Sequence, residues 1–213
     1  MYNFVGHADY YFLAAAAFWG LFCAHMIWTQ IGRIRYKNEA QQQQFLDSVS
    51  ADIAGGNFEQ AEQTCEGNPK ALAMLVSLAL KNRELDTPAL QELVLDRFQY
   101  DILAQIEARV NWVTTIIKLA PMLGLIGTVA GMMGAFETLE TATTSEPTKQ
   151  LLADIRMALE HTLMGLLITV TLLVVMGVVN NRIKDMEELV AFGLNRFFED
   201  FEQGKKSAAR VRR

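Results

Sequence analysis

Two threonines are the side chains of this sequence whose type and spacing best suit proton movement. Thr128 lies in an uncharged stretch of eighteen residues, Leu119 to Phe136, and Thr162 opens a second apolar stretch that ends at Val179. A hydroxyl both donates and accepts hydrogen bonds, so a ring of threonines would hold water and hydrate a carboxylate brought in by another polypeptide. Neither stretch has Asp or Glu in its middle, so this chain would not supply that carboxylate itself.

The depth of the two hydroxyls supports a shared role. Thr128 lies eight residues before Phe136, and Thr162 lies six residues after Arg156. At ~1.5 Å per helical residue, both lie on the order of 10 Å below the same membrane surface. Thr169 continues the helical stripe of Thr162, so we include it among the predicted pore-lining residues. The alternative is a hydrogen bond to the threonine's own helix, which suits Thr169 well and Thr128 and Thr162 less well.

Glu160 and His161 directly precede Thr162 and are titratable. Successive residues of a helix are turned by about 100°, so both are expected to point away from the stripe of Thr162. Two alternatives stay open for them. Either residue takes part in a proton relay, or Glu160 simply pairs with Arg156, four residues earlier.

The sequence disfavours several other kinds of site. Its two cysteines, Cys23 and Cys65, fall in different predicted environments and cannot pair, and no His/Cys cluster predicts a metal site. It has no P-loop, nucleotide-binding or hydrolase motif, so neither a cofactor nor an enzymatic activity is expected. The basic tail KKSAARVRR is expected to meet anionic lipid headgroups rather than nucleic acid.

Small residues recur every three or four positions along the stretch that carries Thr128. They lie on one helical face, and the set is Ala120, Gly124, Gly127, Gly131 and Gly134. Gly165 lies on the stripe of Thr162 in the other stretch. In lipid no hydrophobic effect drives helices together, and small residues let helix backbones approach closely. The glycines therefore predict a helix-packing face.

Three apolar segments predict an all-α membrane protein with transmembrane helices at residues 10–31, 112–136 and 156–180. Lys and Arg follow the first and third segments, which places those ends in the cytoplasm. The predicted order is an external N-terminus at 1–9, a cytoplasmic helical region at 32–111, an external loop at 137–155, and a cytoplasmic C-terminal helix and basic tail at 181–213. A cleaved leader is the alternative for the first segment, although no Lys or Arg precedes it.

Helical periodicity continues outside the membrane segments. Short helices are predicted at 37–54, 58–67 and 71–82, the last being apolar but too short to span a membrane. A long helix meets no breaker from Thr87 until Pro121 and is expected to bend there as it enters the second span. An apolar stripe from Ile183 to Phe201 extends the third helix into the cytoplasm.

The stretch LAPMLGLIGTVAGMMGAF followed by ALEHTLMGLLITV resembles the paired spans of the MotA/TolQ/ExbB proton-channel family, closest to its three-span ExbB and TolQ members. The resemblance covers roughly residues 10 to 200. It implies a homopentamer around a central pore that holds the helices of a smaller ExbD- or TolR-like single-span subunit with a membrane aspartate. Family threonines that line the pore map onto Thr128 and Thr162. Proton flow would drive rotation at the bacterial inner membrane and pass force to a TonB- or TolA-like envelope protein.

Two departures from the family pattern fall in the third span. Met157 stands where the family often has a glutamate, and Thr171 stands where ExbB-like members often have a proline. Both weaken the expectation of a second proton site on this chain, because Glu160 would replace the glutamate only from a neighbouring face.

Alternative functions stay open at this point. A non-conducting oligomeric scaffold would use the glycines for packing alone. A flagellar-type stator subunit is disfavoured, because stator proteins of the MotA type have four spans and a larger cytoplasmic domain. The residues do not separate an ExbB-like from a TolQ-like role, or protons from sodium ions.

Overall fold

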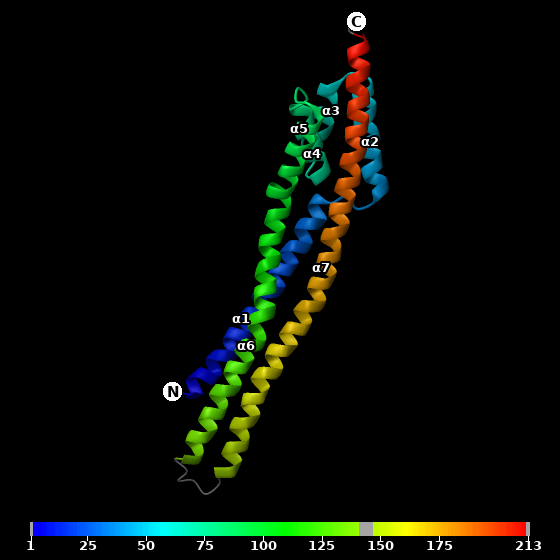
Figure 1. Ribbon diagram of the computed structural model, residues 1–213. Helices are drawn as coiled ribbons and strands as arrows, with labels where there is room; N and C mark the ends of the chain where they lie inside the picture. Colours follow the sequence, from blue (N-terminus) through cyan, green and yellow to red (C-terminus); the bar gives the residue numbers. More distant parts are fainter. Residues whose placement is uncertain (1, 141–146, 212–213) are drawn as a thin grey trace. The chain divides into compact units, whose positions relative to one another are not determined.

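The structure is a computed structural model that describes residues 2–140 and 147–211, and all regular structure in these two ranges is helical (Figure 1). The elements in chain order are α1 (Tyr2–Ile34), α2 (Glu39–Ala54), α3 (Phe58–Cys65), α4 (Ala71–Lys81), α5 (Thr87–Arg97), the π-helix η1 (Phe98–Leu103), α6 (Ala104–Glu140) and α7 (Pro147–Val211). Three helical stretches are long and apolar enough to cross a membrane, namely Tyr10–Ile34, Thr87–Glu137 and Leu151–Lys205. The predicted all-α class with three candidate transmembrane helices is thereby confirmed for the described residues.

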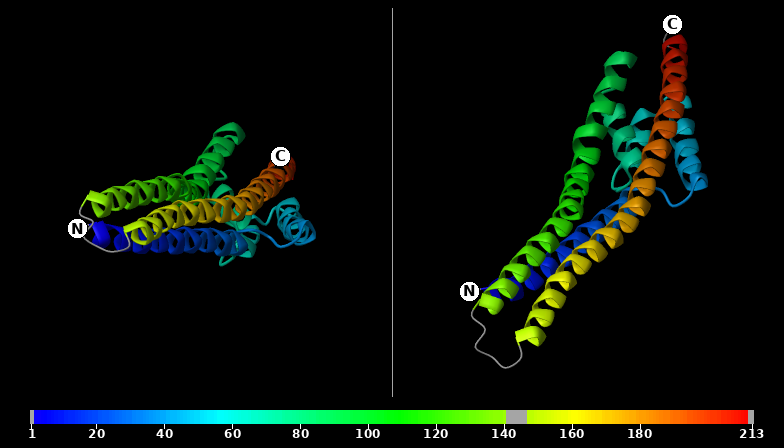
Figure 2. Two further views of the ribbon diagram at one scale, coloured as in Figure 1. Left: turned by 90° about the horizontal axis from the view of Figure 1, so that it is seen from below. Right: turned by 60° about the horizontal axis from the view of Figure 1, so that its bottom comes forward.

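The chain divides into two compact units. The first unit combines Met1–Met26 with Arg109–Val179, and the second combines Ile27–Ala108 with Asn180–Arg213. Parts of α1, α6 and α7 lie side by side in the first unit (Figures 1 and 2). Gly20 lets α1 approach both other helices, because a Cβ added there would lie 2.8 Å from Leu172 Cδ1 and 3.5 Å from Ile116 Cγ2. The first unit holds all the predicted site residues.

The segment predicted as an external loop, 137–155, is helical in much of its length. Helix α6 continues to Glu140 and α7 begins at Pro147, while residues 141–146 lie outside the described residues. No glycine or proline stands between Phe136 and Glu140 to end α6. Pro147 suits the first turn of α7, because an N–H at that position has no partner within a helix.

The short apolar helix α4 supplies the core of the second unit. Seven of its eleven residues are buried, as expected for a helix that is too short to span a membrane: Ala71, Leu72, Ala73, Leu75, Val76, Ala79 and Leu80. Helices α3 and α5 pack against it. From α7, Phe197 and Phe201 stack with their ring centres 5.6 Å apart, and both are buried. Burial also raises the pKa of the Cys65 thiol to about 12, so this thiol stays protonated at neutral pH.

The π-helix η1 keeps one apolar stripe facing that core. Five buried residues follow one another at four-residue intervals: Leu90, Val94, Phe98, Ile102 and Ile106. At about 100° per residue, four such steps on an α-helix would drift by about 160° around the helix. The wider turn of η1 accommodates one extra residue, which removes about 100° of that drift. The five residues therefore stay within about 60° of one face.

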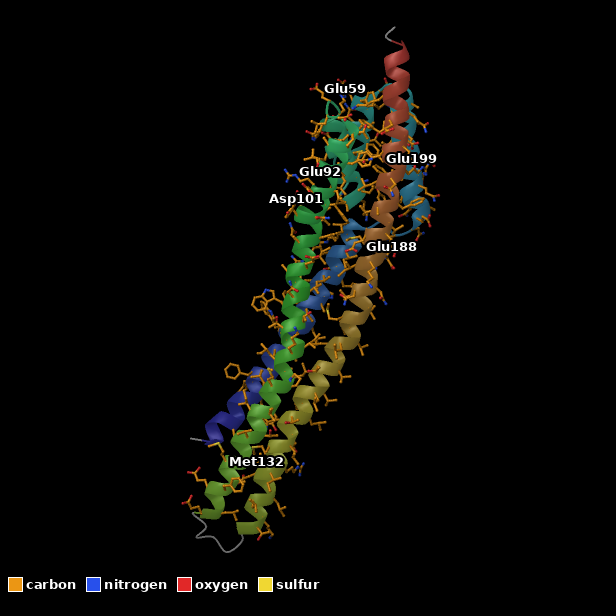
Figure 3. The ribbon with its side chains drawn as sticks, in the orientation of Figure 1. Glu59, Glu92, Asp101, Met132, Glu188 and Glu199 are labelled. Carbon is orange, nitrogen blue, oxygen red and sulfur yellow. The ribbon has the colours of Figure 1, made fainter. Side chains whose placement is uncertain are left out.

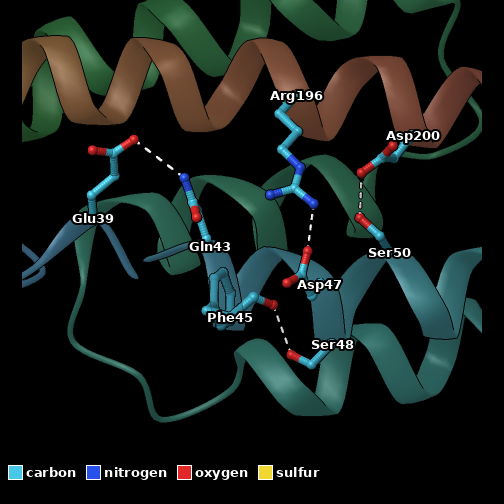
Figure 4. A network of polar contacts seen from close by, with 8 residues as sticks. All are labelled: Glu39, Gln43, Phe45, Asp47, Ser48, Ser50, Arg196 and Asp200. Atoms are coloured by element: carbon cyan, nitrogen blue, oxygen red, sulfur yellow. Dashed lines mark hydrogen bonds and ion pairs between the residues drawn. The ribbon is translucent and has the colours of Figure 1, made fainter. Parts of the chain in front are cut away.

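Polar contacts fasten α2 to α7 in a parallel arrangement (Figure 4). Gln42 is buried and donates from Nε2 to the carbonyl oxygen of Leu189 at 2.6 Å, while Arg196 pairs with Asp47 further along both helices. Exposed ion pairs contribute little to stability, so the buried amide is the stronger link. Other carboxylates of this unit, including Glu92, Asp101 and Glu199, lie exposed on its surface (Figure 3).

Candidate functional site

Helices α6 and α7 approach each other closely along the predicted small-residue face. A Cβ added at Gly124 would lie 2.8 Å from the carbonyl oxygen of His161, and one at Gly131 would lie 2.6 Å from Ala158 Cβ. A Cβ added at Gly165 of α7 would lie 2.5 Å from the carbonyl oxygen of Ala120. Real Cβ atoms essentially never come this close to another atom, so this contact between the helices requires glycine at these positions.

Gly127 and Gly134 extend the same side of α6. A Cβ added at Gly127 would lie 2.7 Å from His161 Cβ. Gly134 is half-buried. The face is therefore occupied, over at least Gly124 to Gly131, by α7 of the same chain.

Thr162 bonds across this contact. Its Oγ1 donates to the carbonyl oxygen of Gly124 on α6 at 3.0 Å. Thr128 instead donates to Leu125 of its own helix at 2.7 Å. Both threonines are half-buried, and each hydroxyl uses its single proton on a backbone carbonyl. Their oxygens still carry lone pairs that can accept a hydrogen bond from water or from a protonated group.

Thr169 lies next to the break that Pro121 makes in the hydrogen bonding of α6. Proline has no N–H, so the carbonyl of Ile117, four residues earlier, loses its usual donor. Thr169 Oγ1 lies 3.3 Å from that carbonyl oxygen and 3.0 Å from the carbonyl oxygen of Gly165 in its own helix. Threonine hydroxyls commonly satisfy carbonyls that a proline frees inside transmembrane helices. The contact gives Thr169 a structural task that spacing alone did not reveal.

Glu160 and His161 lie where α1 meets α7. The Glu160 side chain is 45% exposed, whereas His161 is 2% exposed and lies against Gly127 of α6, so α7 meets α6 through His161 as well as through the stripe of Thr162. The glycine removes the side chain that would fill this space on α6. His161 Nδ1 lies 2.7 Å from the carbonyl oxygen of Met157. A carbonyl only accepts hydrogen bonds, so the imidazole donates from Nδ1.

Sequence reasoning missed Tyr10 of α1. Its ring centre lies 4.2 Å from that of His161, and its hydroxyl donates to Glu160 Oε2 at 3.4 Å. The predicted pair of Arg156 and Glu160 forms as well, with Nε donating to Oε1 at 2.9 Å. No signal in the sequence connects Tyr10 to residues 150 positions later.

The side chains of Met157 and Thr171, the two departures from the family pattern, do not enter this group. Met157 is 41% exposed, and the exposed Thr171 donates to Leu167 of its own helix. Among the described residues no group of His, Cys, Asp and Glu could hold a metal ion. The geometry therefore places hydroxyls, a carboxylate and an imidazole within three apolar helices.

The outward faces of these helices are apolar. Large exposed side chains on α6 and α7 of the first unit include Met122, Leu125, Ile126, Val129, Met132, Leu163, Leu167, Val170 and Val174; Figure 3 labels Met132. Such surface on helices of this length is expected to meet lipid or other transmembrane helices. The protein is therefore a membrane protein.

No curated protein matches the chain. A family model described as the MotA/TolQ/ExbB proton channel family matches residues 68–191. This range is more than half of the 213 residues and includes both the glycine face of α6 and the stretch of α7 that it contacts. The chain belongs to the MotA/TolQ/ExbB proton channel family.

Proposed function

We propose that this chain is the channel subunit of a proton-motive-force-driven complex of the ExbB–ExbD or TolQ–TolR type. Family membership supports a proton-channel type of membrane subunit. The observation that carries the finer proposal is the placement of Thr128 and Thr162. Both are half-buried on the paired helices and keep hydroxyl oxygens within an otherwise apolar span.

In the proposed complex, several copies of the chain, five by the resemblance, surround a central pore. Thr128, Thr162 and Thr169 line the pore and hold water beside a membrane aspartate that a single-span ExbD- or TolR-like subunit supplies. This chain has no acidic residue in the middle of its apolar stretches, which is consistent with such a division of labour. Proton flow then produces force on a TonB- or TolA-like envelope protein, in transport or envelope maintenance.

The distribution of basic residues supports an orientation in the bacterial inner membrane. Arg33, Arg35 and Lys37 follow the first apolar stretch, and Arg182 and Lys184 follow the third. Lys and Arg are enriched on the cytoplasmic side of membrane proteins. We therefore place the N-terminus outside and the second unit in the cytoplasm.

A non-conducting scaffold is the second candidate, and the close contact of α6 with α7 favours it specifically. The glycines Gly124, Gly127 and Gly131 fit this contact within one chain and need no ion flux to explain them. A scaffold would lose function when the helix contact is lost and would be indifferent to the hydroxyl of Thr128.

The two candidates are separated by replacing Thr128 and Thr162 together with alanine. We expect the double variant to assemble normally and to lose at least about tenfold of its proton-driven work, because the hydroxyls that hold pore water are gone. The measurement is complementation of a deletion strain under energised conditions, with native mass spectrometry to confirm the oligomer.

The matched control replaces Thr115 and Thr171 with alanine. Both are exposed and donate within their own helices, so full activity is expected. Full activity of the Thr128/Thr162 variant would show that the pore role is wrong. Loss of its oligomer together with its activity would favour the scaffold.

A further inference from the structure

Tyr10 connects α1 to a charged pair on α7. Its hydroxyl donates to Glu160 Oε2 at 3.4 Å, and Arg156 Nε donates to Oε1 of the same carboxylate at 2.9 Å. The two oxygens of Glu160 thus receive hydrogen bonds from two different helices. The contact holds the first part of α1 against α7.

The ring and the hydroxyl of Tyr10 have separate partners. The ring lies against the ring of His161, with centres 4.2 Å apart and planes inclined by 39°. His161 is buried, lies over Gly127 of α6 and is hydrogen-bonded to Met157. Removing the hydroxyl alone would therefore leave the packing against His161 in place and cut only the bond to Glu160.

The strength of this contact depends on the charge of Glu160. Hydrogen bonds to an ionised carboxylate are roughly twice as strong as those between neutral groups. When a proton binds, an O–H bond forms on one carboxylate oxygen, the negative charge is lost, and the bonds from Tyr10 and Arg156 both weaken. The Glu160 side chain is 45% exposed in the single chain, so it lies outside the packed core of the three helices.

We propose that Tyr10, Glu160 and Arg156 form a proton-sensitive link between α1 and α7, in which Tyr10 is a positioning residue. The link is closed when Glu160 is ionised and loosened when Glu160 is protonated. Its use in the cell rests on the proposed function, because the coupling ion is then a proton.

The groups that face Glu160 define the switch. Among the side chains that the structure describes, Tyr10 of α1 and Arg156 of α7 bond to Glu160, and His161 of α7 packs against the ring of Tyr10. Helix α6 presents glycine backbone, at Gly124 and Gly127, to this part of α7. Neither contact brings a further charged side chain of α6 to the link.

The hydroxyl is tested with Tyr10→Phe in the purified full-length protein. Infrared difference spectra between acidic and alkaline buffer should contain a carboxylate band that disappears in Glu160→Gln. We expect Tyr10→Phe to move the frequency of this band, because one of its two donors is lost. The matched control is Tyr11→Phe, since Tyr11 is the next residue, is 78% exposed, and should leave the band unchanged.

The link itself is tested by amide hydrogen exchange along α1, corrected for the intrinsic effect of pH. At alkaline pH, we expect exchange around Tyr10 to rise roughly tenfold in Tyr10→Phe and in Glu160→Gln, as for loss of a hydrogen bond to a charged group. At acidic pH the unmodified protein should match both variants.

Exchange around Tyr10 that responds neither to pH nor to these substitutions would overturn the proposal. An unchanged carboxylate band in Tyr10→Phe would do so as well. The infrared band and the amide exchange test the link even if the chain does no proton-driven work. Failure of the proposed function is detected separately, by the activity of the Thr128/Thr162 variant. A role of Tyr10 in packing alone would leave Tyr10→Phe indistinguishable from the unmodified protein.

Discussion

At the residue scale, the pairing of Thr169 with the carbonyl freed by Pro121 has a measurable consequence. Thr169→Val keeps the shape and loses the hydroxyl, so Ile117 keeps an unsatisfied carbonyl. We expect the free energy of unfolding in detergent to fall by about 1 kcal/mol, as for other hydrogen bonds between transmembrane helices.

Pro121→Ala supplies the internal control for that prediction. Alanine restores an N–H that can donate to the carbonyl of Ile117. Thr169→Val should therefore lower the free energy of unfolding clearly less in the Pro121→Ala background than in the unmodified protein. Equal costs in both backgrounds, measured in a double-mutant cycle, would show that the threonine does not serve this carbonyl.

Gly127 and Gly177 form a second residue-scale comparison. A side chain at Gly127 meets His161 Cβ at 2.7 Å, whereas a Cβ at Gly177 meets nothing within 4 Å. We expect Gly127→Leu to lower the free energy of unfolding by roughly 3 kcal/mol or more through overpacking and to disturb the oligomer as a consequence. Gly177→Leu should change the stability of the single chain little. Thermal unfolding in detergent and native mass spectrometry measure both, and equal behaviour of the two variants would contradict the observed packing.

Part of the site could be predicted from the sequence at this scale. The three-to-four-residue spacing of the glycines indicated a packing face, and the pair of Arg156 and Glu160 followed from its four-residue spacing. The contacts of Tyr10 and the inward direction of His161 could not be predicted. They depend on how α1 lies against α7, and helical periodicity carries no information about the rotation of one helix relative to another.

At the element scale, the extra residue in η1 predicts that the fold tolerates deletion of one residue from this π-helix. Removing the exposed Tyr100 from η1 would turn the π-helical turn into an α-helical one, and Leu90 to Ile106 would still share one face within about 60°. We expect a loss of less than ~1 kcal/mol, measured by thermal unfolding with circular dichroism.

Deleting Gln99 together with Tyr100 provides the contrast. The second deletion turns the later part of the stripe by a further ~100°, so Ile102 and Ile106 would leave the core. We expect this variant to lose several kcal/mol, by the usual cost of exposing two large aliphatic side chains. Equal melting temperatures for the single and double deletions would show that the stripe does not set the register.

Hydropathy and length predicted the elements better than their ends. The three apolar segments and the short α4 emerged from composition, because lipid and core burial both select apolar residues over a defined length. The π-helix did not emerge in this way, and neither did the helical residues 137–140 and 147–155 of the predicted loop. Helix α6 continues beyond the apolar segment because no helix-breaking residue stands between Phe136 and Glu140. The π-helix compensates for buried residues spaced four apart, and this spacing looks like an ordinary amphipathic α-helix in the sequence.

At the scale of the whole molecule, two kinds of surface on α6 and α7 serve different contacts. One is the glycine face, which is occupied within the chain, and the other is the set of exposed apolar side chains. The glycines are used within the chain, so assembly of copies has to use other surfaces, such as the large apolar side chains that the single chain leaves exposed. In the proposed complex, one such surface meets a neighbouring copy, and the hydroxyls of Thr128 and Thr162 meet the partner's membrane helix.

Proton flux into liposomes tests the central proposal most directly. The chain is reconstituted alone and, in parallel, together with the proposed single-span subunit that carries a membrane aspartate. The account predicts little flux from the chain alone, and flux with the subunit that falls at least about tenfold in the Thr128→Ala/Thr162→Ala variant. Strong flux from the chain alone, or flux with the subunit that is indifferent to both threonines, would contradict it.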